Sequence, residues 1–284
     1  MSDADVAAAN AGRDMTRYRR YMKEQVRELL TEYGKIDLMW FDFSYPNLKY
    51  PKGRADWDSE GLLALARSLQ PQLIVDNRLD LNETDWGWDF VTPEQFRPSA
   101  WPTVRGRRVP WESCQTFSGS WGYFRDEASW KDVPQLLELL AGCVAKGGNL
   151  LLNVGPTGRG TFDGRAKERL AGMGAWMRRN ARSIYGCTEA PAEFTPPPNT
   201  VLTYNPVAKR LYIHLIGYPM GRLPVSFGAR ILYAQFLHDA SELRLQRIPD
   251  WQKETCPVGA DDAYLDLPVR RPNVPNPVIE VFLN

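Results

Sequence analysis

Two carboxylates in aromatic surroundings are the residues with the clearest chemical potential in this sequence. Asp42 lies in "LMWFDFS" at residues 38–44, and Glu112 lies in "PWESC" at residues 110–114. Each follows a short apolar run typical of a buried strand, so we expect each to end a strand. Glycoside hydrolysis needs such a pair, since one carboxylate attacks the sugar carbon and the other protonates the leaving oxygen. The structural alternative is that Asp42 caps a turn and Glu112 pairs with an arginine.

Tryptophan is frequent in this chain, with 10 among 284 residues. Several lie in polar, glycine-rich stretches: Trp57, Trp86, Trp88, Trp101, Trp111 and Trp121. Ordinary packing explains any one of them equally well, but together they favour a cleft with flat apolar walls, which sugar rings fit. Trp111 next to Glu112 would shield that carboxyl from water, raise its pKa and suit it to acid catalysis.

Helices and strands alternate in the apolar pattern that precedes the C-terminal third of the chain. The spacing predicts helices over 15–33, 58–69, 129–147 and 163–186, and strands over 35–42, 72–78, 109–114 and 149–155. Such alternation implies parallel strands joined by helical crossovers. Because the active sites of parallel α/β folds lie at the carboxyl ends of the strands, we expect the residues that follow these strands to line a cleft.

A second domain is predicted beyond the last helix. Short apolar runs separated by Pro, Gly, Asn and Asp fill the rest of the chain, which is typical of an antiparallel β-sandwich. We therefore predict an α/β catalytic domain over residues 1–190 and a β-sandwich over residues 191–284.

Composition argues against several classes of protein. The balance of 35 basic and 34 acidic residues gives no support for a nucleic-acid or membrane partner. Four scattered cysteines and two histidines do not predict a metal site. No apolar run approaches the ~18 residues of a membrane span. The N-terminal stretch "MSDADVAAANAGRD" lacks an apolar signal core. The compartment stays open from the sequence, with the bacterial cytoplasm or periplasm as the expectation.

Five motifs resemble those of a known family. "IDLMWFD", "LIVDNR", "PWESCQTFSGSWGY", "GGNLLLNVGPTGRGTF" and "IYG" occur in this order and at similar spacing in the α-L-fucosidases of glycoside hydrolase family 29. The resemblance covers roughly residues 14–190. It implies retaining hydrolysis of terminal α-L-fucosyl linkages through a covalent aspartyl intermediate, with a fucosylated glycan or glycoside as substrate and neither metal nor cofactor.

The resemblance also implies roles for particular residues. Asp42 matches the nucleophile of the family, and Glu112 matches the general acid/base of many members. Trp40 and Arg78 match residues that contact the sugar. The predicted substrate-binding residues are Trp40, Arg78, Trp111 and Trp121. For a retaining pair, the carboxyl groups of Asp42 and Glu112 are expected about 5–5.5 Å apart.

The chain also departs from the family pattern. Family members have a long stretch before the nucleophile, whereas here the nucleophile is already at position 42 and no histidine precedes His214. Since a (β/α)8 barrel takes about 250 residues, we predict a partial TIM barrel, the C-terminal half with four strand–helix units, followed by the sandwich. The predicted inner face carries Leu38, Trp40, Ile74 and Leu151, and a symmetric homodimer would cover it most simply.

Three functions remain open from the sequence. The first is an α-L-fucosidase, active alone or when another chain completes the barrel. The second is a truncated remnant with weak or absent catalysis that still binds sugar. The third is an assembly module whose carboxylates only hold loops. Because the pocket histidines of the family are missing, we expect weak or absent turnover by this chain alone.

Overall fold

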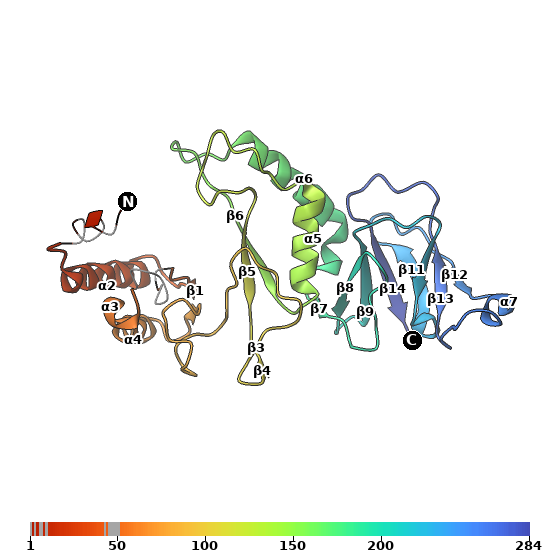
Figure 1. The fold of residues 1–284 in the computed structure, drawn as a ribbon, viewed down its shortest axis with the longest axis horizontal. Helices are drawn as coiled ribbons and strands as arrows, with labels where there is room; N and C mark the ends of the chain where they lie inside the picture. The colour runs from red at the N-terminus through yellow and green to blue at the C-terminus, as the bar shows by residue number, and fades with distance from the viewer. Residues whose placement is uncertain (1, 3, 6–7, 9–10, 43, 45–51) are drawn as a thin grey trace. The chain divides into compact units, whose positions relative to one another are not determined.

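The computed structural model describes residues 2, 4–5, 8, 11–42, 44 and 52–284. The chain divides into two compact units, Met1–Thr92 and Pro93–Asn284. Figure 1 labels most of the helices and strands of both units. This division differs from the predicted domains 1–190 and 191–284, whose boundary stays a prediction.

The first unit packs helices against a short parallel pair of strands. Its helices are α2 (Met15–Glu32), α3 (Arg54–Trp57) and α4 (Ser59–Leu69), and its strands are β1 (Leu38–Met39) and β2 (Ile74–Val75). Asp14 caps α2 by accepting a hydrogen bond from the Thr16 amide at 2.8 Å. Gly34 follows α2 with a φ of +79°, the conformation that commonly ends helices. The predicted helices over 15–33 and 58–69 are thus confirmed, and the predicted strands are present but shorter.

A second parallel pair opens the larger unit. Strand β5 (Glu112–Thr116) pairs in parallel with β6 (Asn149–Asn153), and the helices α5 (Val133–Val144) and α6 (Gly164–Asn180) follow the two strands in sequence (Figure 1). Asp132 and Gln135 form a capping box at the start of α5. A hairpin of β3 (Thr103–Val104) and β4 (Arg107–Arg108), which the sequence patterns did not predict, precedes β5. Its two turn residues both have positive φ, as the usual tight hairpin turn requires.

The C-terminal part is an antiparallel sandwich, as predicted. One sheet has the order β11-β14-β9-β8-β7 and the other β10-β13-β12. The strands are β7 (Thr188–Glu189), β8 (Thr200–Asn205), β9 (Arg210–Leu215), β10 (Arg222–Val225), β11 (Ile231–Phe236), β12 (Leu245–Arg247), β13 (Ala263–Asp266) and β14 (Val278–Leu283), with α7 (Asp250–Lys253) between β12 and β13. Both sheets contribute to one core, which includes Ile213 and Val281 from the first and Leu223 and Leu265 from the second.

The sandwich and the helices of the second unit share a further core. Tyr212 and Val278 of the five-stranded sheet pack with Leu137 of α5 and Trp176 of α6. Strand β7, which precedes the predicted boundary at residue 190, already pairs with β8. This continuous packing explains why residues 93–284 form one compact unit rather than two.

Candidate active site

Three of the predicted site residues meet after the strands of the first unit. The Arg78 Nη1 donates a hydrogen bond to the Asp42 Oδ1 at 2.9 Å. The guanidinium carbon of Arg78 lies 4.4 Å from the centroid of the Trp40 ring, and its Nη2 donates to the Thr92 carbonyl at 3.2 Å. The Asp42 side chain is 51% exposed and that of Arg78 only 15%. A largely buried cation therefore holds an accessible carboxylate in one orientation.

The register of the parallel strands explains this meeting. Met39 of β1 pairs with Val75 of β2, and Asp42 and Arg78 each follow three residues later in the sequence. Parallel, in-register strands deliver such residues to the same edge of the sheet. Phe41 is buried in the core, so the next residue, Asp42, turns outward. The strand-end reasoning from the sequence is thus supported for Asp42 and Arg78.

A third carboxyl lies behind this pair, and the sequence reasoning missed it. Asp76 follows β2 directly and is 0% exposed. Its Oδ1 accepts a hydrogen bond from the Phe41 amide at 3.1 Å. Burial raises the pKa of Asp76 to about 7, and hydrogen bonds from the Phe41 and Arg78 amides oppose that rise. An aspartate directly after the apolar run "LIV" was the only available sign of a buried carboxyl.

Glu112 lies at the opposite end of its strand from the one expected. It begins β5, where its register partner is Asn149, the first residue of β6. The carboxyl ends of these strands are Thr116 and Asn153. Active sites of parallel α/β folds lie at the carboxyl edge of the sheet. Since a strand rises about 3.3 Å per residue, Glu112 is separated from that edge by the whole length of β5. The expectation that Glu112 ends a strand is therefore wrong, and its acid/base role stays a proposal that this position weakens.

Trp111 is a core residue. Its side chain is 1% exposed, and its Nε1 donates to the Lys146 carbonyl at 2.8 Å. Gly148 lies so close that an added Cβ would fall 2.1 Å from the indole ring. A ring this deeply buried offers no open face to a ligand, so its burial argues against the substrate-binding role of Trp111, which stays a prediction.

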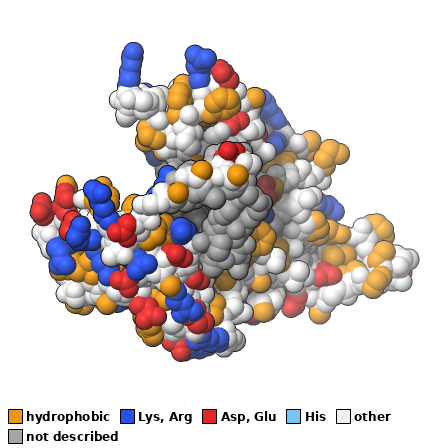
Figure 2. Space-filling model, turned by 60° about the vertical axis from the view of Figure 1, so that its left-hand side comes forward, with side chains coloured by type: hydrophobic (Ala, Val, Ile, Leu, Met, Phe, Trp, Pro, Cys, Tyr) orange, Lys and Arg blue, Asp and Glu red, His pale blue; other side chains and the backbone are white. Residues whose placement is uncertain are grey.

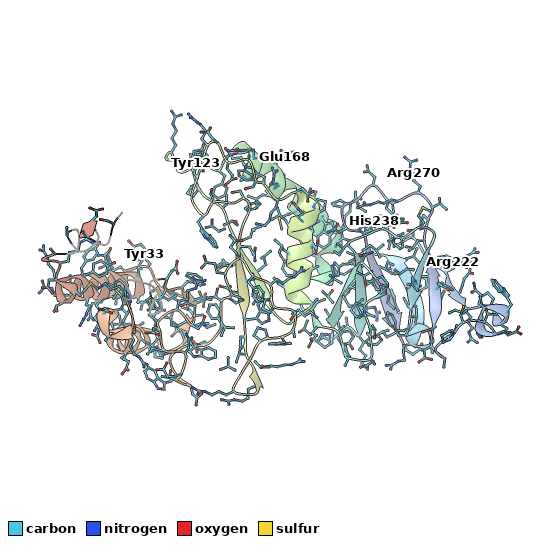
Figure 3. The ribbon with its side chains drawn as sticks, in the orientation of Figure 1. Tyr33, Tyr123, Glu168, Arg222, His238 and Arg270 are labelled. Atoms are coloured by element: carbon cyan, nitrogen blue, oxygen red, sulfur yellow. The ribbon has the colours of Figure 1, made fainter. Side chains whose placement is uncertain are left out.

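Trp121 has the exposure that a sugar-binding wall needs. It is 42% exposed and lies in the loop that follows β5. The side-chain amide of Asn153, the last residue of β6, donates to the Trp121 carbonyl at 2.7 Å. Figure 3 labels Tyr123 in the same loop, beside the helix that carries Glu168. The loop is thus tied to the carboxyl edge of the β5–β6 pair, and the ligand-binding role of Trp121 stays a prediction.

Two other carboxylates lie nearer that edge than Glu112. Glu94 is exposed and forms a parallel bridge with Cys114, two residues further along β5 than Glu112. Glu127 lies in the loop after β5, where hydrogen bonds from Ser120 and Ser129 lower its pKa to about 2. Because a general acid must hold a proton near neutral pH, Glu127 is unsuited to that work. Sequence reasoning passed over Glu94 because no tryptophan adjoins it.

Charges of both signs are mixed on one face of the described surface. Figure 2 shows basic and acidic side chains interspersed over the face that it presents.

Within the described ranges, no group of three or more His, Cys, Asp or Glu side chains is arranged to hold a metal ion. Among the helices described here, none combines the length and apolar character needed to cross a membrane.

Comparison with known proteins identifies the class of fold. The chain is 33% identical to α-L-fucosidase isoenzyme 1 from Paenibacillus thiaminolyticus, with a TM-score of 0.85 over 98% of this chain and 65% of that structure. It is 25% identical to the Thermotoga maritima α-fucosidase in complex with a mechanism-based inhibitor, with a TM-score of 0.68 over 93% of this chain and 56% of the other. The fold is therefore that of glycoside hydrolases with an α/β domain followed by a β-sandwich.

The sequence comparisons then identify the family. The α-L-fucosidase family profile matches residues 3–182, more than half of the chain. The human plasma α-L-fucosidase is 30% identical over 173 residues, which cover 57% of this chain and 36% of the relative. The Dictyostelium discoideum α-L-fucosidase is 29% identical over 171 residues. The chain belongs to the α-L-fucosidase family, GH29, and its match spans about a third of the length of these curated relatives.

Proposed function

We propose that this chain carries the nucleophile of a retaining α-L-fucosidase. The observation that supports this most is the exposed Asp42 carboxylate, oriented by Arg78 beside the Trp40 ring. In the first step an Asp42 oxygen attacks C1 of the fucosyl unit, and the bond to the leaving oxygen breaks as a general acid protonates that oxygen. Water then attacks C1 of the ester, gives its proton to the same acid/base residue and releases fucose and the Asp42 carboxylate.

The other residues take supporting roles in this proposal. Arg78 orients Asp42 and neutralises part of its charge, and Trp40 and Trp121 offer aromatic faces to the sugar. Two glutamates compete for the general acid. Glu112 is the candidate from family resemblance, whereas Glu94 is exposed and nearer the carboxyl edge of β5. We favour Glu94 on that ground. The short separation predicted for the Asp42 and Glu112 carboxyl groups stays a prediction, as these residues belong to different compact units.

We further propose that β1, β2, β5 and β6 are strands of the C-terminal half of a (β/α)8 barrel. The parallel pairing of β1 with β2 and of β5 with β6 supports this proposal. So does the likeness to a longer Paenibacillus thiaminolyticus fucosidase, of which this chain covers 65%. In this proposal Asp42 and Trp121 follow barrel strands at the same end, as expected of residues in barrel active sites.

Covalent labelling tests the proposed function. The probe is 2-fluoro-fucosyl fluoride, the compound in the trapped-intermediate structure of a Bacteroides thetaiotaomicron α-L-fucosidase. We expect one fluorofucosyl ester per chain, formed as fluoride leaves, and peptide mapping should assign it to Asp42. Asp42→Asn should not be labelled. If the wild-type chain quenches its tryptophan fluorescence with fucose but is never labelled, the sugar-binding remnant is the better description, and if it does neither, the assembly module is.

Self-association is the expected consequence of apolar residues exposed on the short parallel pairs. Leu38 and its register partner Ile74 are 42% and 45% exposed, and Leu151 of β6 is 41% exposed. Each Å2 of apolar surface removed from water stabilises an assembly by about 25 cal/mol. We propose a homodimer that covers these residues, so light scattering should give twice the 32.4 kDa of the chain.

A charged substitution separates this interface from other exposed apolar sites. Ile74→Lys should shift the mass to that of the monomer, because a lysine in the interface would lose its hydration. Val207→Lys, at a 93% exposed position in the sandwich, should leave the dimer intact. A wild-type chain that stays monomeric at micromolar concentration would contradict the homodimer.

A further inference from the structure

One buried carboxyl links the two backbone segments that carry the Asp42–Arg78 pair. The Asp76 Oδ1 accepts a hydrogen bond from the amide of Phe41, the residue directly before Asp42. The amide of Arg78, two residues after Asp76, is near enough to lower the pKa of this carboxyl. A single side chain therefore contacts the chain on both sides of the ion pair.

Core packing alone does not explain an aspartate at this position. Asp76 is 0% exposed, and its Oδ2 has no hydrogen-bond partner within the part of the chain that the structure describes. The neighbouring core residues, such as Phe41, Val75 and Leu79, are apolar. An apolar side chain would fill this space without the desolvation that a carboxyl group suffers. Buried polar groups that persist under such a penalty commonly hold a functional geometry.

We propose that Asp76 is the positioning residue for the Asp42–Arg78 pair. The inference rests on the proposed function of Asp42 as nucleophile. By accepting from the Phe41 amide beside the Arg78 amide, Asp76 fixes the lateral spacing between the Asp42 carboxylate and the Arg78 guanidinium. Nucleophilic attack needs such spacing, because a displacement of about 1 Å can lower a rate about 10²-fold.

Neutral Asp76 suits this work better than its ionised form. The charged groups that act on it are Arg78, which favours its ionisation, and Asp42, which opposes it. When Asp76 is protonated, the charge of Arg78 is available to Asp42 alone. When Asp76 ionises, it competes with Asp42 for Arg78 and places a second negative charge behind the nucleophile. Since burial raises the pKa of Asp76 to about 7, the change should occur close to neutral pH.

The test measures the rate of Asp42 labelling by 2-fluoro-fucosyl fluoride between pH 5 and pH 9. In the wild type, the labelling rate should fall as the pH rises through about 7, because Asp76 ionises there. Fluoride leaves without a proton, so this limb of the pH–rate profile cannot come from a general acid. Asp76→Asn keeps a carbonyl acceptor but cannot titrate, so it should label at a rate within several-fold of wild type and lose the limb. Asp76→Ala removes the link and should label about 10²-fold more slowly.

Asp89→Asn is the matched control. The Asp89 carboxylate also accepts from a backbone amide of β2, that of Val75 at 2.7 Å, but it pairs with Arg67 instead of Arg78. This variant should retain the limb near pH 7. A limb that persists in Asp76→Asn, or a wild-type labelling rate in folded Asp76→Ala, would overturn the proposal.

Hydrogen exchange keeps the positioning role testable if no labelling occurs. Exchange of the Phe41 and Arg78 amides, followed by NMR, should speed up in Asp76→Ala and stay unchanged in Asp89→Asn. Should Asp76→Ala not fold, the protection of these two amides from exchange is compared between Asp76→Asn and wild type from pH 5 to pH 9. Only in wild type should this protection change near pH 7. Unchanged exchange would refute the positioning role, whereas absent labelling with the expected exchange would refute only the catalytic function.

Discussion

Asp42→Ala is expected to reduce any turnover of an aryl α-L-fucoside by the wild-type chain to background, because the loss of a catalytic nucleophile lowers the rate by several orders of magnitude. The covalent intermediate cannot form without the Asp42 carboxylate, which the Arg78 Nη1 holds in place by a hydrogen bond. The measurement is kcat with a substrate whose phenol leaves without acid assistance, so that only the nucleophilic step is compared. If Asp42→Ala keeps turnover within tenfold of wild type, Asp42 is not the nucleophile.

Two further measurements distinguish a missing nucleophile from a damaged fold. Azide added to Asp42→Ala should restore part of the turnover by attacking C1 from the vacated space, and the product should be a fucosyl azide. Asp37→Ala is the matched control, because Asp37 lies just before β1 and pairs with Lys35 on the surface. We expect this control to keep wild-type turnover, and an equal loss in both variants would point to the fold.

Glu94→Gln is expected to lower turnover of substrates with poor leaving groups by about 10² to 10⁴-fold, the usual contribution of a general acid. The same variant should lose far less on activated aryl fucosides, because their leaving groups depart without a proton. The reason for choosing Glu94 is its exposed position beside Cys114, nearer the carboxyl edge of β5 than Glu112. The measurement compares kcat/KM for both types of substrate in each variant.

Glu112→Gln provides the decisive comparison. Glu112 begins β5, so we expect its replacement to affect both types of substrate equally, through packing. Selective loss in Glu112→Gln, with little change in Glu94→Gln, would return the acid role to the residue that family resemblance indicates. Asp126→Asn, an exposed carboxylate paired with Arg125 in the loop after β5, serves as the control and should show neither loss.

Local sequence was sufficient to predict much of the fold. The periodic patterns behind α2, α4 and α6 depend on contacts between residues three or four apart, so a helix can be read from its own stretch of chain. The alternating runs of the sandwich were found for the same reason. The β3–β4 hairpin was missed, since its strands are two residues long and carry little pattern.

Strand boundaries were harder to predict, and the candidate site depends on them. The run 109–114 was expected to be a strand that brings Glu112 to the carboxyl edge, but β5 runs from Glu112 to Thr116. A shift of a few residues is small for a strand prediction, yet it moves a side chain from one end of a short strand to the other. Side-chain position along a strand is set by pairing with β6, which is separated from β5 in the sequence by a long loop and the whole of α5.

By itself, the sequence determined the class of elements, the family and the placing of Asp42 and Arg78 at one edge, because residues that follow parallel strands share that edge. Only the tertiary structure decided burial. Trp111 became a core residue because Gly148, distant in sequence, lies against its ring. The pKa of Asp76 is raised to about 7 because its carboxyl group is buried beside Phe41 inside the first unit, away from water. Burial and the pKa shifts that follow it depend on all the atoms around a group, and those atoms come from segments that no local pattern connects.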